Sequence, residues 1–193
     1  MHTAYQYPTY LLHKQVFSFT GRFRIYNPEG QMVLFCQQKI FKLREDLRVY
    51  ADEAMTQPML AIQARQIMDF SAAYDVSDAL TGEKVGALRR RGWKSIARDE
   101  WEVLDAYDRP VGVLIEDSLG HAMLRRLLLG SLFPQNYDLL VNDRRVMDLR
   151  QRFHMFRYVL ELDFRENSNH EVDPRLGIAA GILLAAIEGK QGD

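Results

Sequence analysis

The feature that most constrains the fold is an uninterrupted apolar segment near the end of the chain. Every residue from Leu176 to Ile187 is apolar or glycine, and charged residues stand only at its flanks, Arg175 and Glu188. A helix without a polar face is either buried in a protein core or embedded in a membrane. Because a membrane-spanning helix needs about 20 apolar residues, this run is too short to span. The segment therefore predicts a buried core helix.

This helix is predicted to extend from Pro174 to Glu188 and to be thin. Asp173 precedes it as an N-cap, proline takes the first helical position, and Gly189 follows its end. A helix of this length spans roughly 22 Å, close to the height of a barrel built from strands of six or seven residues. A slim apolar rod threading a closed β-barrel fits this pattern. The small residues that make it slim are Gly177, Ala179, Ala180, Gly181, Ala185 and Ala186.

The rest of the chain carries a β-hairpin pattern that recurs five times. Each copy has alternating apolar residues, a turn cluster and an apolar return strand. In the first copy Phe23 and Ile25 flank Arg24, so one face of the strand is expected to lie inside and the other in water. The copies are FRIYNPEGQMVLF from Phe23, LRVYADEAMTQPMLAI from Leu47, YDVSDALTGEKVGAL from Tyr74, WEVLDAYDRPVGVLI from Trp101 and YDLLVNDRRVMDL from Tyr137.

Two further runs, Gln38 to Leu43 and Phe153 to Phe164, have strand composition and bring the expected total to about ten to twelve strands. A meander of that many antiparallel strands either splits into two sheets or closes to remove its edges. The expected fold class is mainly β (α+β): a closed antiparallel barrel of about twelve strands around a central hydrophobic C-terminal helix. A second helix, Leu119 to Leu129, is expected to pack on the barrel mouth.

The composition is that of one ordinary globular domain. The chain has 193 residues, 26% charged residues and a formal net charge of -1, which does not favour nucleic-acid binding. Cys36 is the single cysteine, so an internal disulfide is excluded. Tyr5, Tyr7, Tyr10 and His13 interrupt every apolar stretch at the start, which argues against a secretory signal. We expect one domain over 1–193, with its core over about 10–188, in the cytoplasm.

Four segments follow one another along the chain: YDVSDALTGEKVGALRRR, DEWEVLDAYDRPVGVLIED, YDLLV and DPRLGIAAGILLAAIE. This succession resembles the LURP-one-related family, within the tubby C-terminal-like and phospholipid-scramblase-like group. The resemblance implies a twelve-stranded barrel around a central C-terminal helix. Members of the group are associated with phosphoinositide-dependent membrane tethering in the tubby branch and with lipid movement in the scramblase branch. The Cys-rich palmitoylated stretch of the scramblases has no counterpart here.

The densest basic patch lies between Lys84 and Arg98 and contains no acidic residue. Its guanidinium groups are suited to lipid phosphates, and a tryptophan in its middle is suited to the headgroup level. The competing interpretation is a solvated strand whose arginines pair with Asp99, Glu100 or Glu102. Strand alternation also predicts that Arg90 points to the opposite face from its two neighbours. The candidate lipid-binding residues are Lys84, Arg89, Arg90, Arg91, Trp93, Lys94 and Arg98.

Other candidate chemistry is weaker. Cys36 lies in an apolar run and is expected to be a buried, inert thiol. The histidines show no metal-ligand spacing, and no nucleophile elbow or glycine-rich phosphate loop occurs. A second basic stretch is interrupted by Asp143 and Asp148, and an acidic trio is expected to form a polar connection into the last helix rather than a Ca²⁺ loop. The stretch comprises Arg144, Arg145, Arg150, Arg152 and Arg157, and the trio Glu166, Glu171 and Asp173.

Three functions remain open. The first is a non-enzymatic binding or scaffold domain whose partner is an anionic phospholipid or a membrane-associated protein, which would place the protein peripherally at a membrane. The second is a small-ligand carrier or enzyme with a pocket at the barrel mouth. The third is scramblase-like activity through the C-terminal segment. No cofactor, no metal and no catalytic residue is expected.

Overall fold

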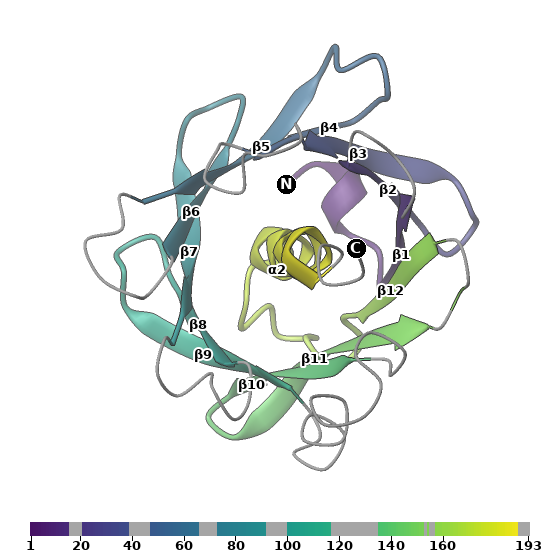
Figure 1. Ribbon diagram of the computed structural model, residues 1–193. Helices are drawn as coiled ribbons and strands as arrows, with labels where there is room; N and C mark the ends of the chain where they lie inside the picture. The colour runs from purple at the N-terminus through teal and green to yellow at the C-terminus, as the bar shows by residue number, and fades with distance from the viewer. Residues whose placement is uncertain are drawn as a thin grey trace.

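Twelve antiparallel strands form one closed ring within the part of the chain that the structure describes, residues 1–15, 21–38, 47–65, 73–91, 100–116, 135–152, 154 and 157–188. In this computed structural model, strands that follow one another along the chain are neighbours in the ring. The ring closes because β1 pairs with β2 on one side and with β12 on the other. Figure 1 looks along the barrel, with helix α2 at its centre. The predicted closed barrel around a C-terminal helix is confirmed.

The described elements begin with a short 3-10 helix and end with the long α-helix. The 3-10 helix is η1 (Thr3–Tyr5) and the α-helix is α2 (Pro174–Glu188). The strands are β1 (Thr9–Gln15), β2 (Gly21–Tyr26), β3 (Met32–Gln38), β4 (Leu47–Tyr50), β5 (Pro58–Ala64), β6 (Ala73–Asp78), β7 (Lys84–Arg90), β8 (Glu100–Leu104), β9 (Pro110–Glu116), β10 (Asn136–Val141), β11 (Arg144–Arg152) and β12 (Arg157–Asp163).

All five predicted hairpins are confirmed as the pairs β2–β3, β4–β5, β6–β7, β8–β9 and β10–β11. The first turn shows why its residues suit it: Gly30 has a φ of 77°, and Asn27 holds the turn through a 2.8 Å hydrogen bond from the Gln31 amide. The predicted run Phe153 to Phe164 contains β12. The rest of the run Gln38 to Leu43 and the helix Leu119 to Leu129 lie outside the described residues.

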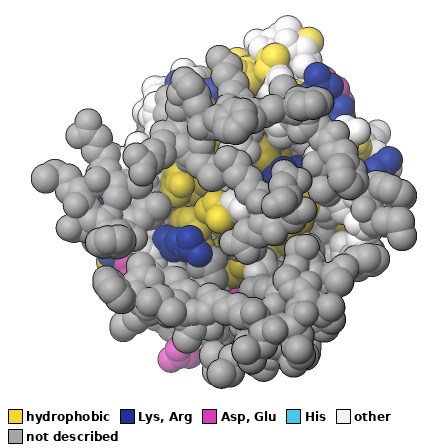
Figure 2. All heavy atoms as spheres, in the orientation of Figure 1, with side chains coloured by type: hydrophobic (Ala, Val, Ile, Leu, Met, Phe, Trp, Pro, Cys, Tyr) yellow, Lys and Arg dark blue, Asp and Glu magenta, His cyan; other side chains and the backbone are white. Residues whose placement is uncertain are grey.

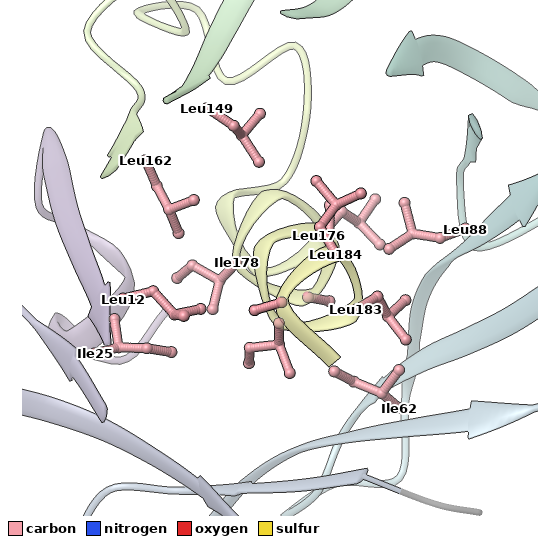
Figure 3. Packing of buried hydrophobic residues seen from close by; sticks show 14 of the residues in the cluster. Leu12, Ile25, Ile62, Leu88, Leu149, Leu162, Leu176, Ile178, Leu183 and Leu184 are labelled. Carbon is pink, nitrogen blue, oxygen red and sulfur yellow. The ribbon is translucent and has the colours of Figure 1, made fainter. Parts of the chain in front are cut away.

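Helix α2 fills the barrel. Ile178, Ile182 and Ala185 have no solvent-exposed surface, and the helix belongs to one buried cluster with inward side chains of the strands. Figure 3 shows Leu12, Ile25, Ile62, Leu88, Leu149 and Leu162 pointing from the wall toward the helix. Removal of apolar surface from water stabilises a protein by about 25 cal/mol for each Å², so the contact between α2 and the wall stabilises the barrel. The helix has no polar face because the strands of the barrel surround it on all sides.

Two glycines allow this close approach. A Cβ atom on Gly177 would lie 2.6 Å from Cε1 of Phe164 and 2.7 Å from Sδ of Met147. A Cβ atom on Gly181 would lie 2.8 Å from Cδ2 of Leu162. Each glycine costs the helix about 1 kcal/mol relative to alanine, and the close packing explains why that cost is accepted. The predicted slimness of the rod is therefore required by the barrel wall.

Helix α2 begins at a capped terminus. The Asp173 carboxylate accepts a 2.9 Å hydrogen bond from the Arg175 amide, as expected of an N-cap. The Arg175 side chain binds the same carboxylate at 2.7 Å and approaches Asp78, at the end of β6, at 3.3 Å. These contacts fix the start of α2 against the barrel rim. In the described part of the chain, no helix is long and apolar enough to cross a membrane.

The segment before β1 folds back against the same end of the barrel. The Tyr10 hydroxyl donates to the Ala4 carbonyl at 3.0 Å and accepts from the Tyr7 amide at 3.1 Å. The Phe164 amide donates to the Pro8 carbonyl at 2.8 Å. Figure 1 shows η1 inside the outline of the ring. This segment covers the barrel where α2 begins.

Candidate functional site

The predicted basic patch divides into parts that face different ways. Lys84 opens β7, Arg89 and Arg90 end it, and Arg91 follows directly. Three further members of the patch lie between β7 and β8, in residues 92–99, outside the described part of the chain: Trp93, Lys94 and Arg98. The geometry of the site therefore rests on the four residues of β7 and its end.

Arg89 and Arg91 bind one carboxylate on the outer wall. The Nε atom of Arg89 lies 2.6 Å from Oε2 of Glu102, and the Nη2 atom of Arg91 lies 2.7 Å from Oε1. Arg91 also pairs with Glu100. Burial raises the pKa of Glu102, but hydrogen bonds from Arg91 and Arg89 outweigh it and hold the pKa below its ordinary value. The competing interpretation, pairing with Glu100 and Glu102, is confirmed for these two arginines.

Arg90 points to the inner side, as strand alternation predicted. Its guanidinium lies 5.9 Å from the ring centre of Trp101, which is buried and stands opposite Arg90 in the β7–β8 register. The ring centre of Tyr74 lies 6.1 Å from that of Trp101. Burial raises the pKa of Tyr74, and the charge of Arg90 works against that shift. Arg90 thus makes a cation–π contact with Trp101 at the end of the barrel.

Lys84 is drawn away from the other three residues. Its ammonium lies 2.8 Å from Asp108 and 3.2 Å from Asp75. Arg65 binds the same two carboxylates, at 2.6 Å in the case of Asp75. Hydrogen bonds from Lys84 and Arg65 lower the pKa of Asp108. These four side chains form a charge-balanced network, so Lys84 is not part of the surface that Arg90 occupies.

A buried lysine, which sequence reasoning missed, lies at the same end as Arg90. The Nζ atom of Lys14 donates a 2.8 Å hydrogen bond to the carbonyl oxygen of Ala185, in the last turn of α2, and lies 5.5 Å from the ring centre of Phe23. Strands β1 and β7 run in the same direction in the antiparallel ring, so their ends share one mouth. The inward position of Lys14 could have been predicted from the sequence, because strand alternation places Tyr10, Leu12 and Lys14 on one face.

We call the barrel end marked by Lys14, Arg90 and Trp101 the C-terminal mouth, since α2 ends there. A cation there also complements the partial negative charge that the backbone dipoles create at the end of a helix. Figure 2 shows dark blue Lys and Arg side chains next to yellow hydrophobic ones within the hollow of the molecule. The C-terminal mouth therefore combines basic and apolar side chains.

The second basic stretch is largely neutralised. Arg145 lies 2.8 Å from Glu166, Arg150 lies 2.6 Å from Asp148, and Arg144 pairs with Glu171. Some of these side chains line a polar cavity of about 170 Å³ on the outer wall over β11 and β12. Its full lining is Arg145, Asp148, Arg150, Glu161, Asp163, Arg165 and Glu166. Because positive and negative groups alternate in it, the cavity offers no strong preference for either sign of charge.

The acidic residues before α2 form ion pairs and cap the helix. Glu166 and Glu171 bind Arg145 and Arg144, while Asp173 caps α2. Among the described residues, no three His, Cys, Asp or Glu side chains are grouped so as to hold a metal ion. Cys36 is fully buried, and that burial raises the pKa of its thiol to about 12. A buried thiol of this kind does not act as a nucleophile at neutral pH.

The fold and the mouth define the class of protein: a closed β-barrel whose interior is occupied by its own C-terminal helix. The model of the LURP-one-related family matches residues 32–185, and the chain belongs to that family. Comparison with curated proteins and with solved structures gave no significant match.

Proposed function

We propose that this protein is a non-enzymatic binding domain that recognises anionic phospholipid headgroups at the C-terminal mouth. The observation that carries the proposal is the placement of Arg90, whose guanidinium lies over Trp101 at the barrel end instead of joining Arg89 and Arg91 on Glu102. Guanidinium groups bind phosphate oxygens in a bidentate way, and the buried ring of Trp101 holds the Arg90 guanidinium at the barrel end.

Because α2 fills the interior of the barrel, binding at its surface is favoured over binding of a ligand inside it. The side chains of α2 are buried against the strands, and a Cβ atom at Gly177 or Gly181 would collide with side chains of the barrel. A carrier of small molecules needs a cavity, and cavities that hold ligands typically measure about 300 to 1,000 Å³. A ligand at the barrel centre would have to displace α2. Recognition at the mouth leaves the core intact.

The experiment is vesicle sedimentation with pure phosphatidylcholine and with phosphatidylcholine mixed with phosphatidylserine. We expect binding only to the anionic vesicles, and a decrease with added salt because exposed charges are screened. Arg90→Gln should weaken binding about five-fold, since one basic residue near an anionic surface contributes about 1 kcal/mol. Arg109→Gln is the matched control, because Arg109 is exposed in the β8–β9 turn and held by Asp105 at 2.7 Å. Equal binding to both vesicles, or equal loss in both variants, would reject the proposal.

The alternative partner for the C-terminal mouth is a membrane-associated protein. The vesicle assay distinguishes the two partners, because binding to a protein does not require anionic lipid. Kinship to the tubby C-terminal-like group, a cytoplasmic location and peripheral membrane attachment are parts of the same proposal. Scramblase-like activity through the C-terminal segment is less favoured, because the segment would first have to leave the barrel core. Lipid transfer between leaflets of labelled vesicles tests that alternative directly.

A further inference from the structure

We infer that the outer wall over β12, β1 and β2 holds a second binding site, one for a small organic anion with a flat apolar body. This site is separate from the C-terminal mouth and does not depend on the function proposed there. It is a groove of about 430 Å³, within the size range of ligand pockets. The lining residues that the inference uses are Leu11, His13, Tyr26, Arg152, Arg157 and Glu161.

The groove has one cation without a carboxylate partner. Arg152 is held by Glu161, with 3.0 Å from Nε and 2.5 Å from Nη2 to Oε2. Within the described residues, Arg157, the first residue of β12, forms no ion pair, although arginines of the neighbouring strand β11 do. An anion that binds beside this exposed guanidinium gains charge-assisted hydrogen bonds, which are about twice as strong as neutral ones. Arg157 therefore supplies the anchor for a carboxylate or a phosphate.

A histidine lies in the groove beside Arg157 and can take up a proton when an anion binds. Burial lowers the pKa of His13 from its ordinary value, and the charges of Arg157 and His154 lower it further. An anion bound between His13 and Arg157 would reverse this effect by favouring the imidazolium. The other charged group nearest along the sheet is Arg24, opposite His13 on β2, which is bound to Glu53 at 2.6 Å. Glu161 is held by Arg152 and excludes a second anion.

The apolar side of the groove is aromatic and preformed, with the rings of His13 and Tyr26 tilted by 55° to one another. The ring centres of His13 and Tyr26 lie 5.1 Å apart, and Leu11 stands opposite Tyr26 in the β1–β2 register. The turn after Tyr26 is held by the Asn27 amide, which donates to the Gln31 carbonyl at 2.9 Å. Rings on a rigid strand pair accept another ring by offset stacking or edge contact. The occupant that fits both sides is an aromatic anion.

The test is titration with 2-naphthoate, with 2-naphthamide as the neutral counterpart and inorganic phosphate as the anion without a ring. Binding is followed by NMR from the His13 ring protons and the Leu11 methyl groups. We expect naphthoate to shift both sets of signals, and the amide and phosphate to bind about tenfold more weakly or worse. Equal binding of naphthoate and naphthamide would overturn the inference, because the charge would then contribute nothing.

Two variants locate the site and leave the core untouched. Arg157→Gln, at an exposed position, should weaken naphthoate binding about tenfold, whereas Arg90→Gln should leave it unchanged. His13→Asn should remove the pH dependence, which in the unaltered protein is tighter binding at pH 5 than at pH 8, because protonated His13 attracts the carboxylate. Unchanged binding by Arg157→Gln, or a pH dependence that survives His13→Asn, would also overturn the inference. Circular dichroism confirms that each variant is folded.

Discussion

The ammonium of Lys14 lies inside the barrel and donates its hydrogen bond to the carbonyl oxygen of Ala185 on the central helix. Two elements far apart in the chain, the first strand and the last helix, are joined by this contact. The last carbonyl groups of a helix have no partner within the helix, so a buried helix end needs donors from elsewhere. Lys14 supplies one of them.

Replacement of Lys14 by methionine should destabilise the protein. The methionine fills similar space but leaves a buried carbonyl without this donor, which costs about 1 to 3 kcal/mol. The measurement is the free energy of unfolding from urea denaturation. Gln15→Met is the matched control, because Gln15 follows on the same strand and is exposed. A Lys14→Met variant as stable as the unaltered protein would contradict this role.

Alanine at Gly181 should have opposite effects in two backgrounds. In the unaltered protein its Cβ atom meets Leu162, so overpacking of about 1 to 3 kcal/mol should exceed the gain in helix propensity. In a Leu162→Ala background the obstacle is gone, and Gly181→Ala should stabilise by about 1 kcal/mol. A double-mutant cycle from urea denaturation measures the coupling. The same sign in both backgrounds would show that the contact with Leu162 does not limit the helix.

A charge in the middle of α2 should abolish the folded state. Ile182 has no exposed surface, so Ile182→Asp places a carboxylate in the apolar core, a change that costs several kcal/mol. The readout is the loss of a cooperative thermal transition by circular dichroism. Leu80→Asp is the control, because Leu80 is 64% exposed in a hairpin turn and should tolerate the charge. If Ile182→Asp remains folded, residues 176–187 cannot be the core of the barrel.

Stability should fall in acid through the carboxylate that Arg89 and Arg91 share. The folded pKa of Glu102 lies below its ordinary value of 4.5, so the stabilising contribution is complete above that value. It is lost as the pH falls through the folded pKa. Glu102→Gln should therefore flatten the decline of the unfolding free energy below about pH 5. Glu29→Gln, in the exposed β2–β3 turn, should leave the decline unchanged, and an equal effect of both substitutions would refute the assignment.

The sequence predicted the hairpins and the central helix because their determinants are local. Turn residues such as Gly30 and alternating residues such as Phe23 and Ile25 act within a few positions of one another. Strand β1 was not predicted as an element, since its partners in β12 stand at the other end of the chain and no turn joins the two strands. Sequence patterns report neighbours along the chain better than neighbours in space.

The candidate site was predictable only in part. Alternation correctly separated Arg90 from Arg89 and Arg91, because the direction of a side chain follows from its place in the strand. The division of Glu102 between two arginines depends on the register between β7 and β8, which the sequence does not specify. The lysine at the helix end was overlooked because a charged residue at an inward position is rare unless it finds a partner.

The pairing of Thr9 with Asp163, and of Gln15 with Arg157, dictates an order of assembly. During synthesis the chain emerges from its N-terminus, so β2 to β11 are all made after β1 and before β12, the second neighbour of β1. Until then the growing sheet has two unpaired edges, and such edges pair readily with strands of other chains. The helix that must occupy the interior arrives later still. The ring cannot close before β12 is made, and a sheet formed from the earlier strands would expose edges that chaperones can protect.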